Sequence, residues 1–430
     1  MKPALLNYIK QLFILLVIGA LSGLIVGLYQ LGIQNIVKVS TFMYSSKDAF
    51  ILFILIFLVS FCMVFNNILI LKDAAIDGSG IPSLKLSRRQ NKPISFIKDI
   101  PYQILNSYAS TFTGFPLGSE GPSVVLASKI SYGVNKLFRN ENKTLDELAE
   151  GVGFGSAFLS PLAGFCYSIE ESLESKVTFK KIISAIIMML SAFIITSLIN
   201  KNHLLSITSF EKLSLNDSYI YVFILIINIV VSFIFIKIML VLRAFFTKYN
   251  KNKFIKFRSI PLYIITFILN IFLLDLMQSG GKLISSIATN HTLYIVILIL
   301  AFRFLLTAIS GSGDITGGLV VPIMAIGAIN GEIVSIISSN IFGFNLDNSQ
   351  LICLMSALMM FAITIQTPFT AISLLFSTIF TFTEDITLAL SMIPFFTLAI
   401  FFGYIVMSRL LKQKSLYEGM IEVSLKYQSK

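Results

Sequence analysis

Long apolar runs separated by short polar segments dominate this chain. Such runs cover residues 12–36, 49–71, 182–199 and 219–242. Each is long enough for a helix that crosses the hydrocarbon core of a bilayer, which takes about 20 residues with a range of about 17–25. The pattern therefore predicts a membrane protein with several transmembrane helices.

A second class of apolar segment is too short to span a bilayer alone. These segments include residues 102–112 and 124–137, and stretches broken by Gly and Pro lie beside them. Two of the breaks, at residues 118–122 and 317–322, occupy corresponding places in the two halves of the chain. Short broken helices in matching positions are typical of transporters with a binding site near the midplane. Irregular backbone at that depth is tolerated only where it is buried or lines a cavity.

The composition supports a membrane protein and removes other classes. Of 430 residues, 56% are hydrophobic and 13% are charged, which is more apolar sequence than a soluble core absorbs. The net charge of +11 does not indicate nucleic-acid binding, because the basic residues fall in short segments between apolar runs, as in cytoplasmic loops. Segment 200–217 has few basic residues and is expected outside. The expected cytoplasmic segments carry Lys85, Arg88, Arg89, Lys92 and Lys98, then Lys176, Lys180 and Lys181, then Arg243, Lys248, Lys251, Lys253, Lys256 and Arg258.

Metal and cofactor chemistry finds little support in the sequence. The three cysteines, Cys62, Cys166 and Cys353, lie in apolar runs and are interpreted as buried small hydrophobes. His203 and His291 are too few and too far apart for a metal site. An ATPase is set aside, since Gly281-Lys282 has neither the upstream Gly nor the following Ser or Thr of a phosphate-binding loop, and Asp314 is interpreted as a turn or cap residue. No cofactor and no metal are expected.

Glu120 is the most informative ionisable residue. It lies between Gly118 and Gly121, two residues before Pro122 and shortly before an apolar run. Pro122 suits the first turn of a helix, and the unpaired N–H groups of a helix start attract anions. An ionisable group at membrane depth costs about 2.5–3.5 kcal/mol and is functional by default. A structural ion pair is the alternative, but no basic residue is close in sequence, so we expect Glu120 to act as a gate and proton carrier.

Five short motifs follow one another over nearly the whole chain. They are Gly78-Ser79-Gly80-Ile81-Pro82, Gly118-Ser119-Glu120-Gly121-Pro122, Pro161-Leu162-Ala163-Gly164 running into Glu170-Glu171, Gly317-Gly318-Leu319-Val320-Val321-Pro322, and Lys414-Ser415-Leu416-Tyr417. In this order they resemble the motifs of the CLC chloride channel and antiporter family. The resemblance implies a homodimer with a separate anion path in each subunit, each subunit built from two inverted-repeat halves.

The resemblance assigns roles to individual residues. Glu171 is implied as the intracellular proton acceptor and Glu170 as its structural neighbour, although both could be boundary carboxylates that face Lys176. Ser79 could otherwise be a turn or N-cap residue, and Tyr417 an interfacial aromatic anchor. The implied anion-binding residues are Ser79, Gly80, Ile81, Gly121, Leu319, Val320 and Tyr417.

Elementary chemistry agrees with this set. A dehydrated chloride ion needs donors, but a full counter-charge would hold it too tightly to release. Hydroxyls such as those of Ser79 and Tyr417, backbone N–H groups of Leu319 and Val320, and helix N-termini supply partial charges, each helix end contributing about 0.3–1 kcal/mol.

Two positions depart from the family pattern. Ser119 stands where the family usually has Arg, which removes a positive charge beside the gate. Val320 stands where the family usually has Phe, which changes one wall of the anion site. We expect both to bear on anion selectivity.

The sequence thus predicts an all-α polytopic membrane protein of the inverted-repeat CLC type, with broken and re-entrant helices. The expected half-repeats cover residues 10–199 and 218–407, a cytoplasmic-side helix covers 413–427, and no soluble regulatory domain is expected. The expected function is exchange of chloride for protons in a bacterial inner membrane, in contact with lipid and with both termini cytoplasmic. A passive chloride channel of the same fold and a non-transporting receptor or scaffold are the alternatives.

Overall fold

The computed structural model describes residues 2–72, 78–91, 96–140, 142–205, 218–249, 259–273, 278–281, 284, 292–313, 315–346, 349–383 and 386–428. Within these ranges the protein is helical and contains no strand, which confirms the all-α prediction. Some sequence interpretations fall outside the described residues, namely those for Lys92, Lys251, Lys253, Lys256, Arg258, Lys282, His291, Asp314 and most of the expected external segment.

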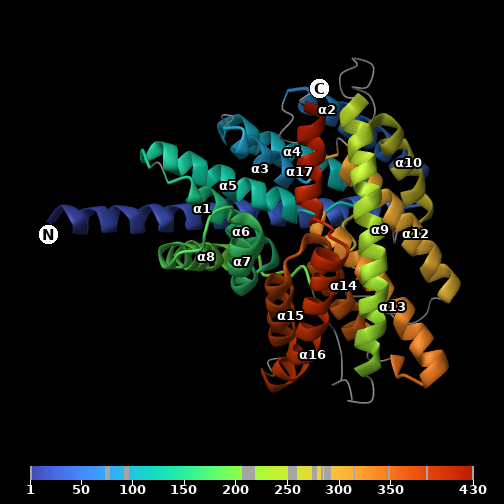
Figure 1. Ribbon diagram of the computed structural model, residues 1–430. Helices are drawn as coiled ribbons and strands as arrows, with labels where there is room; N and C mark the ends of the chain where they lie inside the picture. The colour runs from blue at the N-terminus through green and yellow to red at the C-terminus, as the bar shows by residue number, and fades with distance from the viewer. Residues whose placement is uncertain are drawn as a thin grey trace.

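The helices run in the following order (Figure 1). They are α1 (Lys2–Ser45), α2 (Ala49–Lys72), α3 (Ile81–Arg89), α4 (Phe96–Thr113), α5 (Glu120–Leu137), α6 (Thr144–Phe158), α7 (Pro161–Tyr167), the π-helical turn η2 (Ser168–Ser172), α8 (Phe179–Ile199), α9 (Tyr219–Tyr249), α10 (Ser259–Phe272), α12 (Leu293–Ser312), α13 (Val320–Phe342), α14 (Ser349–Ile365), α15 (Pro368–Thr383), α16 (Ile386–Ile405), the π-helical turn η7 (Val406–Leu410) and α17 (Leu416–Gln428).

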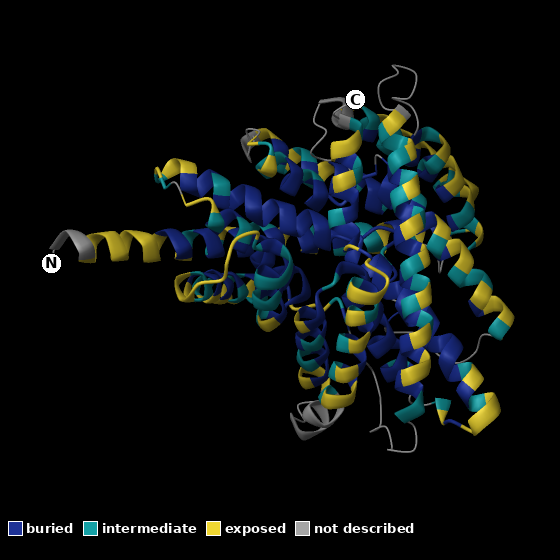
Figure 2. Ribbon diagram, in the orientation of Figure 1, coloured by how far each residue is buried: buried dark blue, intermediate teal, exposed yellow. Residues whose placement is uncertain are grey.

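Seven helices among the described residues are long and apolar enough to cross a membrane. The outer ones expose large apolar side chains, for example Phe50, Phe53, Phe57 and Phe61 along one side of α2. Figure 2 shows exposed positions recurring on the outer helices and buried positions concentrated in the middle. An apolar surface of this extent is unfavourable in water, so the protein is an integral membrane protein whose outer helices suit contact with lipid tails.

The centre of the fold is occupied by α13 and α14. In the most apolar 18-residue stretch of α13, 89% of the residues are buried, whereas the corresponding share for α2 is 17%. The helix α14 has 17 residues and is buried on nearly every side, and it packs along α13. The short helix α14 therefore lies inside the protein, which agrees with its being too short to span a bilayer by itself.

Helices from each half of the chain pack mainly with others from the same half. In the first half α1 packs on α5, α6 and α8, and in the second half α9, α12 and α14 surround α13. Contacts between the halves join α3 to α17, α5 to α13 and α7 to α15. Figure 1 shows α17 lying beside α3 and α9. Several elements that carry the motifs thus meet elements from the other part of the chain.

One apolar stretch is divided into two helices and a π-helical turn. Residues 151–169 do not form a single helix, because the chain breaks at Leu159, whose φ is 52°. Ser160 then caps the next helix, its hydroxyl accepting the Ala163 N–H at 3.4 Å, and Pro161 begins α7. Pro at the first helical position has no N–H to leave unpaired, so a new helix starts here.

Candidate functional site

Three Gly-rich breaks, far apart in sequence, meet in space. The N–H of Gly118 donates to the carbonyl of Gly318 at 2.8 Å, and the N–H of Gly318 donates to the carbonyl of Gly118 at 2.5 Å. The N–H of Gly317 donates to the carbonyl of Gly78 at 3.0 Å. These bonds bring the starts of α3, α5 and α13 together at one point.

Glycine is required where the backbone segments approach each other. A Cβ atom on Gly121 would lie 2.8 Å from both the Gly318 Cα and the Ser79 carbonyl oxygen. A Cβ atom on Gly118 would lie 2.0 Å from Oε2 of Glu120. The glycines therefore leave room both for the junction and for the glutamate side chain.

Glu120 is the first residue of α5 and is 1% exposed. The backbone N–H groups of Ser119, Glu120 and Val321 lie near its carboxylate, and Ser119 Oγ is 3.4 Å from Oε1. The other oxygen, Oε2, has no hydrogen-bond partner among the described residues. The carboxylate thus lies between the N-terminal ends of α5 and α13, where the partial positive charge of each helix favours an anion.

Two buried hydroxyls lie next to this point. Ser79 directly precedes Gly80, the N-cap of α3, and Tyr417 is in the first turn of α17. The Tyr417 hydroxyl is close to that of Ser79 and within electrostatic reach of Glu120 and Glu171. Neither hydroxyl oxygen forms a hydrogen bond within the described part of the chain. A buried polar group left unpaired costs about 1–3 kcal/mol, so two facing hydroxyls of this kind indicate a ligand site.

The backbone at the starts of α3 and α13 completes the surroundings. Gly80 adopts a left-handed conformation with φ of 76°, and Ile81 begins α3 fully buried. Leu319 caps α13 and Val320 is its first residue, both at 0% exposure. The backbone donor nearest Glu120 on this helix belongs to Val321, which the sequence argument did not single out.

A neutral hydrogen-bonded ring that includes Ser119 lies beside Glu120. Ser119 Oγ donates to Gln30 Oε1 at 2.9 Å, and Gln30 Nε2 donates to Ser123 Oγ at 3.0 Å. Ser123 Oγ donates to the Ser119 carbonyl at 2.9 Å. Gln30 lies on α1 and is 1% exposed. Sequence reasoning missed it, although a buried amide in an apolar transmembrane run is a usable signal.

Glu171 lies on the π-helical turn η2 and forms an ion pair with Lys85. Nζ of Lys85 is 2.6 Å from Oε1 of Glu171 and also donates to the Glu171 backbone carbonyl at 2.5 Å. The side chains are 3% and 8% exposed. Lys176, the alternative partner for this carboxylate, is exposed.

Lys85 and Arg88 belong to a basic segment expected on the cytoplasmic side, and the structure encloses both among other helices. Both belong to α3, where Lys85 pairs with Glu171 and Arg88 pairs with the fully buried Glu150. Packing against α5 and α17 encloses this helix, so its cations need buried carboxylate partners.

Glu170 holds the start of α15. Its carboxylate accepts the backbone N–H of Phe369 at 2.8 Å, and the N–H and hydroxyl of Thr370 at 2.7 and 2.6 Å. A carboxylate in this position satisfies N–H groups that the first turn of a helix leaves unpaired. Glu170 therefore joins the first half of the chain to the second.

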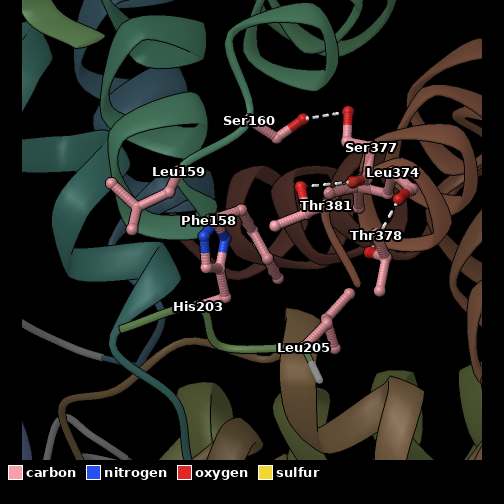
Figure 3. Close-up of a pocket in the computed structure, with 9 residues that line it drawn as sticks. All are labelled: Phe158, Leu159, Ser160, His203, Leu205, Leu374, Ser377, Thr378 and Thr381. Atoms are coloured by element: carbon pink, nitrogen blue, oxygen red, sulfur yellow. Dashed lines mark hydrogen bonds between the residues drawn. The ribbon is translucent and has the colours of Figure 1, made fainter. Parts of the chain in front are cut away.

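A separate pocket lies between the end of α6, the segment after α8, and α15 (Figure 3). Ser160 and Ser377 are hydrogen-bonded at 2.8 Å on its wall. His203 also lines it, and partial burial lowers the pKa of this imidazole. The lining residues do not include Ser79, Glu120, Glu171 or Tyr417, so this pocket is distinct from the candidate ion site.

Comparisons with known proteins find chloride channels and chloride/proton exchangers. The family described as voltage gated chloride channel matches residues 62–408. The H(+)/Cl(-) exchange transporter ClcA of Vibrio cholerae (strain M66-2) is 24% identical, with 97% of this chain and 90% of the relative covered. ClcA of Vibrio vulnificus (strain YJ016) is 23% identical over 75% of this chain and 72% of the relative.

Solved structures share the fold. A slow cyanobacterial Cl−/H+ antiporter superimposes with a TM-score of 0.84 at 21% identity, covering 98% of this chain and 99% of the other. A CLC-type fluoride/proton antiporter superimposes with a TM-score of 0.75 at 19% identity, covering 96% of this chain and 98% of the other. The predicted CLC-type architecture is confirmed.

Proposed function

Because the chain belongs to the voltage-gated chloride channel family, we propose that it exchanges chloride, or a similar monovalent anion, for protons across a bacterial inner membrane. The observation that carries the proposal is the position of the Glu120 carboxylate between the starts of α5 and α13, beside the unpartnered hydroxyls of Ser79 and Tyr417. Relatives named as H(+)/Cl(-) exchange transporters support it.

The anion would bind through partial charges alone. The hydroxyls of Ser79 and Tyr417 donate to it, and the N–H groups at the starts of α3, α5 and α13 face it, with Gly80, Ile81, Gly121, Leu319 and Val320 forming the backbone around it. No full positive charge is required in this arrangement, so binding stays weak enough for release. The neutral ring around Ser119 places no charge on the outer approach to the proposed anion site. Val320 contributes a small side chain to one wall of that site.

Protonation of Glu120 would couple the two ions. The ionised carboxylate competes with chloride for the helix starts, since both are anions. The protonated acid no longer has the charge that those helix starts favour, so it leaves and the anion takes its place. Glu171 would supply or accept the proton on the cytoplasmic side, and Tyr417 lies within electrostatic reach of both carboxylates.

The wider organisation follows from the same proposal. The half-repeats would cover residues 10–199 and 218–407, with α17 on the cytoplasmic side and both termini in the cytoplasm. Each subunit of a homodimer would carry its own path. A passive channel of the same fold is the rival function, and it has no use for an internal proton acceptor such as Glu171.

The decisive experiment uses the wild-type protein in liposomes. With an outward chloride gradient as the single driving force, the vesicles are expected to take up protons, because exchange links chloride exit to proton entry. Chloride and pH electrodes measure both fluxes in the same vesicles. Chloride movement without proton movement would establish a channel, and movement of neither ion would remove the transport proposal.

Loss of either hydroxyl is expected to weaken anion binding. Ser79→Ala and Tyr417→Phe each remove one O–H donor and introduce no charge. A hydrogen bond to a charged group contributes about 1.5–3 kcal/mol, and about 1.4 kcal/mol corresponds to tenfold, so chloride affinity should fall roughly tenfold or more. Calorimetric titration with chloride measures this change. Ser424→Ala, on the same helix as Tyr417, is the matched control, and unchanged affinity in both test variants would place the anion elsewhere.

A further inference from the structure

The ion pair between Lys85 and Glu171 links two functions that the sequence keeps far apart. Lys85 lies one turn into α3, the helix whose start carries Ser79, Gly80 and Ile81. Glu171 lies 86 residues later on η2. A single buried side chain of α3 thus contacts the proposed proton acceptor, while the start of the same helix borders the proposed anion site.

Other charged groups around Glu171 already have partners of their own. Glu150 of α6 pairs with Arg88, and Glu418 of α17 accepts two hydrogen bonds from Arg89, at 2.5 and 3.1 Å. The Arg89 guanidinium holds the pKa of Glu418, which lies outside the membrane-spanning helices, below its usual value. The phenols of Tyr167 and Tyr417 also face Glu171, from α7 and α17.

Lys85 is therefore the cation directed at Glu171 among the described residues. Burial raises the pKa of Glu171, and the carboxylates of Glu150 and Glu418 raise it further because they repel a charge on this group. A contact of 2.6 Å with an ammonium group favours the charged carboxylate against these effects. Without Lys85, Glu171 would take up a proton at a higher pH.

We propose that Lys85 is a positioning residue that holds Glu171 ionised and sets the pH at which this carboxylate accepts a proton from the cytoplasm; this inference rests on the proposed exchange function. In the loading step a proton from water adds to a carboxylate oxygen of Glu171, and the ion pair becomes an ammonium beside a neutral acid. The ion pair forms again when the proton leaves toward Glu120. Lys85 keeps its own proton throughout.

The test compares transport as a function of pH in three variants and the wild type. Lys85→Met removes the cation and keeps the length of the side chain, and Lys85→Arg restores a cation. Coupled transport should decline as the pH is raised, and in Lys85→Met this decline should occur at a pH about one unit or more higher than in the wild type. The reason is that an opposite charge shifts the pKa of a carboxyl group by about 1–3 units. Lys85→Arg should lie near the wild type. Lys176→Met removes an exposed lysine five residues from Glu171, and its pH profile should match that of the wild type.

The outcomes separate this inference from the proposed function. Wild type that moves no protons refutes the exchange proposal, whatever the variants do. Wild type that moves protons, with the same pH profile in Lys85→Met, refutes the role of Lys85. A purely structural ion pair would lower the stability of Lys85→Met and leave the pH profile in place.

A second measurement needs no change at Lys85, in case Lys85→Met does not fold. Infrared difference spectra between wild type and Glu171→Gln isolate the carboxyl band of Glu171 as the pH is lowered. The band should remain that of a carboxylate at neutral pH and change only under more acidic conditions. A protonated Glu171 at neutral pH in the wild type would overturn the proposal.

Discussion

Glu120→Gln is expected to keep chloride flux and to lose all coupling to protons. Glutamine resembles the protonated glutamate in size and carries no charge, so it cannot compete with chloride at the starts of α5 and α13. It also cannot carry a proton. Chloride efflux from liposomes should therefore proceed at the wild-type rate or faster, while proton uptake driven by a chloride gradient falls to background.

The measurement pairs a chloride electrode with a pH electrode on the same vesicles. Glu174→Gln makes the same chemical change at an exposed position that pairs with Arg89, and it should retain coupling. Intact proton pumping in Glu120→Gln would contradict the assignment of this residue as gate and proton carrier. Complete loss of chloride flux would instead mean that the carboxylate itself is needed to form the anion path.

Glu171→Gln is expected to carry chloride while moving few or no protons. The substitution preserves size and most hydrogen bonding but removes a group that can titrate. Chloride would travel past the helix starts and hydroxyls, so its path does not require Glu171. The chloride flux of the variant should also lose most of its dependence on a proton gradient, as measured by the same pair of electrodes, with Glu174→Gln again as the control.

This variant also leaves Lys85 buried without its counter-charge. Breaking a buried ion pair by removing one partner costs about 3–5 kcal/mol, so the thermal stability of Glu171→Gln should fall. The double variant Lys85→Met, Glu171→Gln removes both charges and should recover much of that stability. If Glu171→Gln and wild type move protons equally, the exchanger remains but its inner proton acceptor must be another group.

Much of the architecture could be predicted because its causes are local. Apolar runs of about 20 residues require helices that cross a bilayer, since an unpaired backbone group in hydrocarbon costs several kcal/mol. Gly and Pro stop and restart helices through their own backbone geometry. Pro122 and Pro322 therefore mark the first turns of α5 and α13, and Glu120 is recognisable as an ionisable residue at such a start.

The meeting of the three breaks could be anticipated only from the resemblance to a family. Nothing in the local sequence states that Gly118 pairs with Gly318, or that Tyr417 turns its hydroxyl toward Ser79. Those contacts join residues hundreds of positions apart, and the packing of both halves decides them. The same packing selects Val321 as the nearest donor to Glu120 on α13.

The clearest limit of sequence reasoning is Lys85. A lysine in a segment with Arg88 and Arg89 has the pattern of a solvated cytoplasmic loop, because local charge density indicates exposure. Burial, however, depends on which elements cover a helix, and α3 is covered by α5 and α17, which lie later in the chain. The sequence by itself determined the helices, their breaks and the carboxylate at the start of α5, because these follow from the solvent and from backbone chemistry. Tertiary structure alone decided which carboxylate each buried cation faces, because a charge removed from water must find its partner among whatever the fold brings within reach.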